Sequence, residues 1–281
     1  MSRRLWGLFE PYHSVLYFAP EARARYDEAG LRGFWMGYFA GRSAPMGAVG
    51  PGIVVATFYN FKADMVRRAI PDAWSFASPG AVLDARLGAV DHALRRLIPD
   101  EIGSPALSEA ADLAQAAAME ADVPGRPLYA ANAELAWPDE PHMVLWQATT
   151  CLREHRGDGH VAALMAAGVD GCQAHLTLAG TGRVSRDVLQ PNRGWTDDDW
   201  KTAADQLIAR GWLDGQHQLT DEGRGTRAAI EDRTDRLAET PWSRLGERRA
   251  ERLAELLRPI ARGVVSAGGV PVPNPIGVPE P

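Results

Sequence analysis

The sequence predicts a mainly helical protein with short β-hairpin wings, an α+β fold arranged as two tandem winged-helix-like halves. Three observations predict this fold class. Apolar residues recur at helical spacing over residues 79–97 and again after Asp197. The pair Asp214-Gly215 separates two short extended runs, which is a hairpin signal. The order of segments in residues 1–103 is also repeated, with weak identity, in the residues that follow.

The first hundred residues are expected to alternate helices with loops. A short helix opens at Pro20-Glu21, because proline fits a first helical position and glutamate suits the positive end of the helix dipole. Residues 31–40 are rich in aromatic side chains, and residues 41–52 are loop-like, with four glycines and two prolines. Residues 54–61 are either a buried strand or the start of a helix, since short apolar runs do not distinguish the two.

The second half reads as a diverged copy of the first. Residues 107–121 form an alanine-rich helix, residues 127–131 parallel residues 36–40, and the apolar run 143–148 parallels 54–58. An internal duplication of this kind predicts two similar domains, residues 1–103 and 104–262, with a ligand pocket at their junction. Residues 263–281 are rich in proline and glycine and are predicted to be disordered or an extended arm.

The clearest motif begins at Thr196. Thr196 and Asp199 have the spacing of a capping box, and Gly211 ends the helix that follows. After the Asp214-Gly215 turn, Thr220 caps a long helix running to about residue 239. A helix, a tight hairpin and a second helix are typical of a winged helix-turn-helix module.

The residues of this module also carry a resemblance. The stretch GWTDDDWKTAADQLIARGWLDGQHQLTDEGR resembles the recognition helix and wing of MarR-like proteins, and Leu219-Thr220-x-x-Gly223 is typical of that class. Over most of residues 6–262 the chain is similar to an actinobacterial SalK-like helix-turn-helix family. The matching stretches are EPYHSVLYFAPEAR, YFAGRSAPMG, WPDEPHMVLWQATTCLREHRGDGHVAAL, GWTDDDW and DRLAETPW. The resemblance implies a winged-helix fold and leaves the activity open.

Composition narrows the class of protein. The 281 residues carry 30 Lys and Arg against 36 Asp and Glu, a net charge of −6, which weakens the case for a dedicated nucleic-acid binder. Two cysteines make a disulfide framework unlikely and favour a reducing compartment. No apolar run has the length of a signal peptide or a membrane span, so a cytoplasmic location is expected.

DNA is a disfavoured partner on local grounds too. The expected recognition helix carries Asp197, Asp198, Asp199 and Asp205, and acids near its first turn would repel phosphate. The alternating charges of the C-terminal arginines read as a solvated, ion-paired face. A small organic molecule is therefore the expected partner, and a homodimer is compatible with the sequence.

Candidate chemistry begins with Glu10 and His13. An acid and an imidazole three residues apart could exchange a proton or hold a polar ligand, although a capped helix start explains them equally well. Arg42, in a glycine- and proline-rich context, could offer its planar fork to a carboxylate or phosphate. A structural salt bridge is the somewhat favoured alternative. Arg42, Arg153 and Arg156 stand apart from the arginines of the mixed-charge helices.

The densest candidate run is residues 153–160, in which six of eight residues are ionisable. It contains His155 and His160 and follows His142. A metal site is disfavoured because the spacing matches no metal signature and neighbouring arginines would oppose a cation. The alternative is a helix-loop-helix junction in which Asp158 caps a helix beginning near His160.

These observations lead to one hypothesis with two alternatives. The protein binds a small organic molecule between its halves, and it would act as a cofactor-independent enzyme of specialised metabolism. The alternatives are a ligand-responsive DNA-binding regulator and a sequestering or resistance protein. No cofactor and no metal are expected. The proposed acid-base residues are Glu10, His13 and His155, and the proposed ligand contacts are Tyr12, Arg42, Tyr59, His142 and His160.

Overall fold

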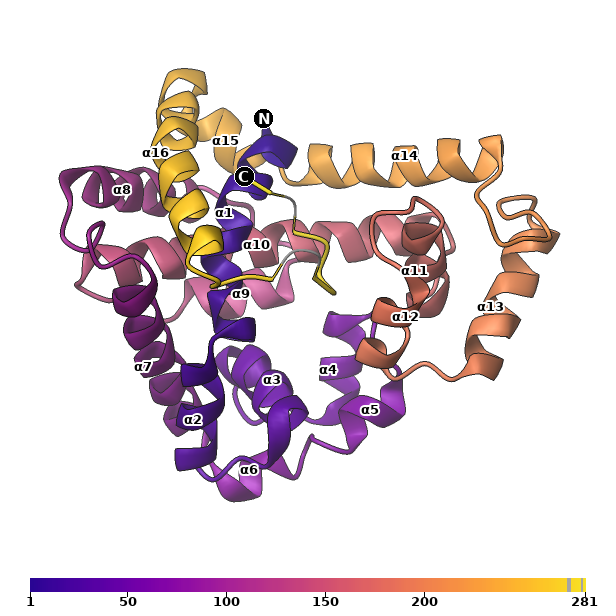
Figure 1. The fold of residues 1–281 in the computed structure, drawn as a ribbon, viewed down its shortest axis with the longest axis horizontal. Coiled ribbons are helices and arrows are strands. Elements are labelled where there is room, and N and C mark those ends of the chain that lie inside the picture. Colours follow the sequence, from indigo (N-terminus) through magenta and orange to yellow (C-terminus); the bar gives the residue numbers. More distant parts are fainter. Residues whose placement is uncertain (272–273, 279) are drawn as a thin grey trace.

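The protein is built from helices. The computed structural model describes residues 1–271, 274–278 and 280–281, and every regular element within these ranges is helical (Figure 1). The helices are α1 (Ser2–Phe18), α2 (Pro20–Glu28), α3 (Gly33–Ser43), α4 (Pro51–Phe58), α5 (Ala63–Arg67), α6 (Ala73–Phe76), α7 (Pro79–Leu97), α8 (Pro105–Met119), α9 (Pro127–Ala133), α10 (Pro141–Ala166), α11 (Gly171–Ala179), α12 (Arg186–Leu189), α13 (Asp197–Ala209), α14 (Asp221–Leu237), α15 (Thr240–Leu245) and α16 (Glu247–Ser266), with 3-10 turns at Ala44–Met46 and Pro191–Arg193.

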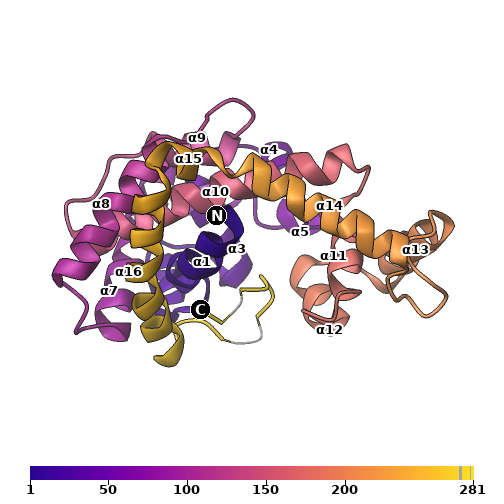
Figure 2. The ribbon, with the colours of Figure 1, turned by 90° about the horizontal axis from the view of Figure 1, so that it is seen from above.

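Two hydrophobic cores organise these helices. The first takes its buried side chains from residues 5–152, from α15 and α16, and from Val270 beyond α16. The second takes them from residues 163–230, which include α11 to α13. Figure 2 shows α11 to α13 set to one side, with α14 running back to the larger body. The boundary predicted at residues 103 and 104 falls inside the first core.

The prediction of β-hairpin wings is wrong, because every regular element in the described residues is a helix. After α13 the chain forms a single isolated bridge between Leu213 and Leu219 instead of two strands. Asp214 shapes the turn, because its Oδ1 accepts the backbone N–H groups of Gln216 and Gln218 at 2.9 Å each. Two backbone bonds cross the turn, from Asp214 N–H to Gln218 O at 2.9 Å and from Thr220 N–H to Trp212 O at 3.0 Å. The pairing ends there because Trp212 N–H donates to the carbonyl of Leu207 in α13 at 2.9 Å.

The N-terminal part of the chain also holds no wing. Residues 51–58 are helix α4, since Pro51 occupies the first helical turn and Val54 and Phe58 are buried four residues apart. Residues 2–18 form one 17-residue helix, α1, with Pro11 inside it. Arg42 lies in the last turn of α3 and not in a loop.

Residues 153–160 lie in the middle of α10, so the predicted junction is wrong. This 26-residue helix begins with Pro141 and is buried along most of its length. Gly159 permits a close approach: a Cβ there would lie 2.2 Å from Arg126 Nη1 and 3.2 Å from Leu237 Cβ. Asp158 does not start a helix within α10. Its Oδ2 accepts from the backbone N–H groups of Leu128 and Tyr129, in the first turn of α9.

The predicted tail is partly helical, because α16 continues to Ser266. Beyond it, Val270, Asn274 and Val278 are buried, and Asn274 Oδ1 accepts from the N–H of Val278 at 3.0 Å. Residues 272, 273 and 279 of the predicted tail lie outside the described residues. Among the described helices, none combines the length and the apolar character needed to cross a membrane.

Candidate functional site

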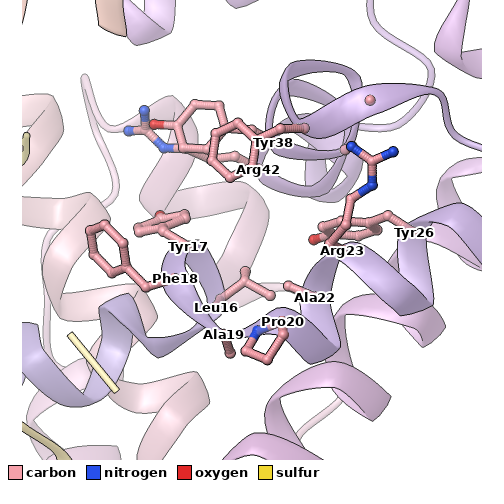
Figure 3. A pocket seen from close by; sticks show the side chains of 13 residues that line it. Leu16, Tyr17, Phe18, Ala19, Pro20, Ala22, Arg23, Tyr26, Tyr38 and Arg42 are labelled. Carbon is pink, nitrogen blue, oxygen red and sulfur yellow. The ribbon is translucent and has the colours of Figure 1, made fainter. Parts of the chain in front are cut away.

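A cavity of about 150 Å³ opens between α1, α2 and α3 (Figure 3). Phe34, Tyr38 and Arg42 line it because residues four apart share one face of α3. Gly37 and Gly41 bring Tyr26 against α3, since a Cβ at either position would lie within 3 Å of its side chain. The remaining lining residues are Leu16, Tyr17, Phe18, Ala19, Pro20, Ala22, Arg23 and Gly33. The cavity is thus mostly apolar, and it lies within the first predicted half instead of between halves.

One end of this cavity is polar. Figure 3 shows Tyr38 and Arg42 side by side, with Tyr17 facing them. Arg42 donates through Nε and Nη2 to Glu154, and its third nitrogen, Nη1, has no hydrogen-bond partner among the described residues. The Tyr38 hydroxyl likewise makes no hydrogen bond to a described residue. Two donors are therefore free at the rim of an apolar space, an arrangement that suits ligand binding.

Behind this polar end lies a cluster of buried charges. Glu154 of α10 accepts from Arg42 at 2.8 and 2.9 Å and from Arg153 Nη1 at 2.8 Å. Glu10 of α1 accepts from Trp6 Nε1 at 3.0 Å and lies 3.6 Å from Arg153 Nε. Burial raises the pKa of Glu10 against the opposing effect of Arg153. Burial also opposes the charge of Glu154, but Arg153 and Arg42 hold its pKa well below the usual range.

His13 connects the charged cluster to the cavity wall. Its Nδ1 lies 3.0 Å from Thr150 Oγ1, and its Nε2 lies 3.0 Å from the Tyr17 hydroxyl. Thr150 donates its own proton to the carbonyl of Trp146, so the network assigns the proton of His13 to Nδ1. Tyr17 then donates to Nε2. Burial and the charge of Arg153 lower the pKa of His13, which keeps the ring neutral at neutral pH.

The structure thus brings together Glu10, His13 and Arg42 of the predicted site residues. Glu10, His13 and Tyr17 share one face of α1, and that face meets Thr150, Arg153 and Glu154 on α10. Tyr17 is a member of this site that sequence reasoning missed. Glu154 lay within the candidate run 153–160 and Tyr38 within the aromatic segment 31–40, but neither was assigned to a site with Arg42. The available signal for Tyr17 was its spacing of four residues from His13.

The other predicted residues lie elsewhere. Tyr12 is buried and donates to the carbonyl of His142 at 2.9 Å, while His142 Nε2 lies 2.6 Å from Asp91. His155 packs edge-on against Tyr129, and its Nε2 has no partner among the described residues. His160 Nδ1 lies 2.9 Å from Thr234 Oγ1. Within the described ranges, no three His, Cys, Asp or Glu side chains are grouped to hold a metal ion.

Tyr59 belongs to a loop that joins the two cores. Its hydroxyl donates to the carbonyl of Val169 at 2.5 Å. The carbonyl of Asn60 accepts from Trp195 Nε1 at 3.1 Å, and Lys62 forms an ion pair with Asp199 at the start of α13. Residues 59–62 therefore fasten the second core to the first.

The exposed face of α13 is acidic. Asp197 and Asp198 are exposed in its first turn, and Lys201 pairs with Asp205 one turn later. The capping box predicted at Thr196 and Asp199 is present. The negative charge of this face opposes contact with a phosphate backbone.

Comparison with known proteins gives one match. A family model described as a helix-turn-helix family matches residues 2–271, which is nearly the whole chain. No curated protein and no solved structure matches significantly.

Proposed function

The chain belongs to this helix-turn-helix family. We propose that it is a small-molecule-binding member whose ligand occupies the cavity between α1, α2 and α3. The observation that carries the proposal is an apolar cavity with the unpartnered donors of Tyr38 and Arg42 at one end. The finer resemblance, to actinobacterial SalK-like proteins, is part of the same proposal and rests on the stretches quoted above.

The size of the cavity limits the ligand. Apolar cavities of about 150 Å³ accommodate a molecule the size of benzene. Phe34 is about half exposed at the rim, so a larger ligand could extend toward solvent there. The proposed ligand has a single ring or a short branched chain as its buried part.

Binding explains the geometry better than catalysis does. Glu10 and His13 do not line the cavity, and His155 lies against Tyr129 on another part of α10. An acid-base step through His13 would have to pass through Tyr17, whose pKa is raised by burial. We therefore propose binding without turnover, as a receptor or a sequestering protein would bind.

A cavity-filling variant tests this proposal. Ala22 is buried and lines the cavity, so Ala22→Leu should fill it without touching the polar end. Ala209→Leu, on the exposed end of α13, adds the same atoms outside the cavity. A library of small organic compounds screened by ligand-observed NMR should give binders whose signals recover in Ala22→Leu and not in Ala209→Leu. Binders indifferent to Ala22→Leu, or no binders at all, would refute the proposal.

Family membership favours a second candidate, a ligand-responsive DNA-binding regulator. The acidic face of α13 disfavours this candidate, because its carboxylates would repel the phosphates of DNA. A gel shift with the DNA upstream of the protein's own gene separates the two candidates. Salt-sensitive binding at micromolar protein would support the regulator, and its absence would leave the binding protein.

A further inference from the structure

The buried region around the cavity holds more positive than negative charge. Four arginines, Arg42, Arg86, Arg153 and Arg193, are largely buried there. The buried carboxylates Glu10 and Glu154 lie among them. A third buried carboxylate, Asp158, is close enough to act on Arg42, and burial raises its pKa to about 7. Even with all three carboxylates ionised, the four arginines leave an excess of one positive charge, in a chain whose overall charge is −6.

Arg86 is the member of this group with the weakest compensation. It is 3% exposed and forms no ion pair with a described residue. Its guanidinium donates to the carbonyl of Gly41 at 3.2 Å and to Asn132 Oδ1 at 3.4 Å, while its Nε has no partner. The group also lies 5.2 Å from the centre of the Trp146 ring. Neutral oxygens and a ring face satisfy an arginine only in part, so its charge remains uncompensated.

Arg193 is buried in a similar way. It donates to the carbonyls of Asn192 and Pro275 at 3.0 Å and lies over the ring of Phe61, again without an acid among the described residues. Burial lowers the pKa of both Arg86 and Arg193, as expected for charges taken out of water.

The buried charges of Arg86 and Arg193 lie directly behind residues that form the wall of the cavity. Tyr26 reaches Gly41, the residue whose carbonyl accepts from Arg86. Tyr38 packs on Phe61, with ring centres 5.5 Å apart, and Phe61 lies under Arg193. Arg42 itself lines the cavity beside Tyr38 (Figure 3). Every polar group at this end of the cavity therefore either carries positive charge or lies next to it.

We propose that the natural ligand is a small organic anion, a carboxylate on an apolar body, whose charged group lies against Tyr38 and Arg42 and supplies the negative charge that the buried arginines lack. The Tyr38 hydroxyl and Arg42 Nη1 donate to its oxygens, and Leu16, Phe18 and Ala22 contact its apolar part. In a space of low polarity an excess positive charge favours an anion over a neutral molecule of the same shape.

This inference rests on the proposed function, and paired probes separate the failure of one from the failure of the other. The probes are phenylacetate and phenylacetamide, which share a ring and differ in charge, measured by calorimetry at pH 7.5. We expect the full-length protein to bind the acid about tenfold or more tightly than the amide. Equal or tighter binding of the amide overturns the anion and keeps the cavity as a binding site. Binding of neither probe refutes both statements.

Variants then test the source of the preference. Arg86 does not line the cavity, so Arg86→Met should reduce the preference for the acid while leaving amide binding within about twofold. Arg86→Lys keeps the charge and should keep the preference. Arg67→Met, at an exposed arginine, is the matched control. Tyr38→Phe removes one donor and should also reduce the preference, which keeps the test decisive if Arg86→Met does not fold. An unchanged preference in both Arg86→Met and Tyr38→Phe would overturn the inference.

Discussion

Arg42 and Glu154, 112 positions apart in the chain, form a two-point ion pair that joins α3 to α10, with Nε–Oε1 and Nη2–Oε2 distances of 2.8 and 2.9 Å. The Glu154 side chain is 2% exposed, so its charge is matched by protein and not by water. Glu154→Gln should lower the free energy of unfolding by about 3–5 kcal/mol, because it leaves Arg42 and Arg153 buried without their shared carboxylate. Urea unfolding followed by circular dichroism measures the loss.

Asp64→Asn provides the matched change at an exposed pair. Asp64 lies 3.4 Å from Arg67, and both side chains are more than half exposed. Exposed pairs of this kind contribute about 0–1 kcal/mol. If the two variants lost equal free energy of unfolding, the buried Arg42–Glu154 pair would contribute no more to stability than an exposed pair.

Gly157 and Gly159 make a second matched pair. At Gly159 a Cβ would displace Arg126, which donates to the carbonyls of His155 and Leu237. At Gly157 the nearest atoms would be 3.6 Å away, an ordinary contact. Gly159→Ala should therefore destabilise the protein by about 1–3 kcal/mol. Gly157→Ala should be neutral or stabilise it by up to about 1 kcal/mol, because alanine favours the helix. Thermal unfolding of the two variants side by side would show whether this order holds.

His160 should make stability depend on pH. Burial lowers its pKa from 6.5 to about 4 in the folded protein. Between these values the unfolded chain binds a proton that the folded chain does not, so the free energy of unfolding falls as the pH falls from 6.5 to 4. The loss amounts to about 3 kcal/mol at most.

His160→Gln removes this titration and keeps a donor near Thr234. Urea midpoints measured from pH 4.5 to 7 should fall less steeply in His160→Gln than in the unmodified protein. Gln216→Asn, which exchanges one exposed neutral amide for another, should leave the slope unchanged. Parallel slopes in all three proteins would show that His160 does not titrate in this range.

The two cysteines should resist modification. Cys151 is fully buried and Cys172 is 4% exposed, and burial raises the pKa of each thiol to about 12. A disulfide reagent at pH 8 should label neither cysteine in the native protein and both in denaturant. Native labelling of Cys172 alone would indicate that the second core opens independently of the first.

The long helices with clear periodicity were predictable, and the site was predictable only in part. The pattern of α7 and the cap of α13 are local, so the sequence alone is sufficient to locate them. Arg42 stands out because it is an arginine among glycines and apolar residues. Its partner Glu154 does not, because the pairing depends on how α3 meets α10, which no local pattern encodes.

The errors have similar physical causes. Pro11 and the two glycines of residues 153–160 favour helix ends locally, yet both segments are helical because tertiary packing outweighs propensity. Asp214-Gly215 does make a turn, but the pairing it begins ends after two backbone bonds, because Trp212 N–H donates to Leu207 of α13 instead of to a second strand. The local sequence preference for a turn at Asp214-Gly215 was predicted correctly, but it did not determine whether strands would form on either side.

Helix α10 contributes buried side chains to both cores, Leu145 and Trp146 to the first and Ala163 and Leu164 to the second. Helix formation is cooperative, so melting one half of α10 weakens the turns next to it in the other half. Unfolding of either core should therefore propagate through α10, and the chain should lose its structure in one concerted transition despite having two separate interiors. Because α10 belongs to both cores, a destabilising mutation in one core should increase the rate of amide hydrogen exchange in the other.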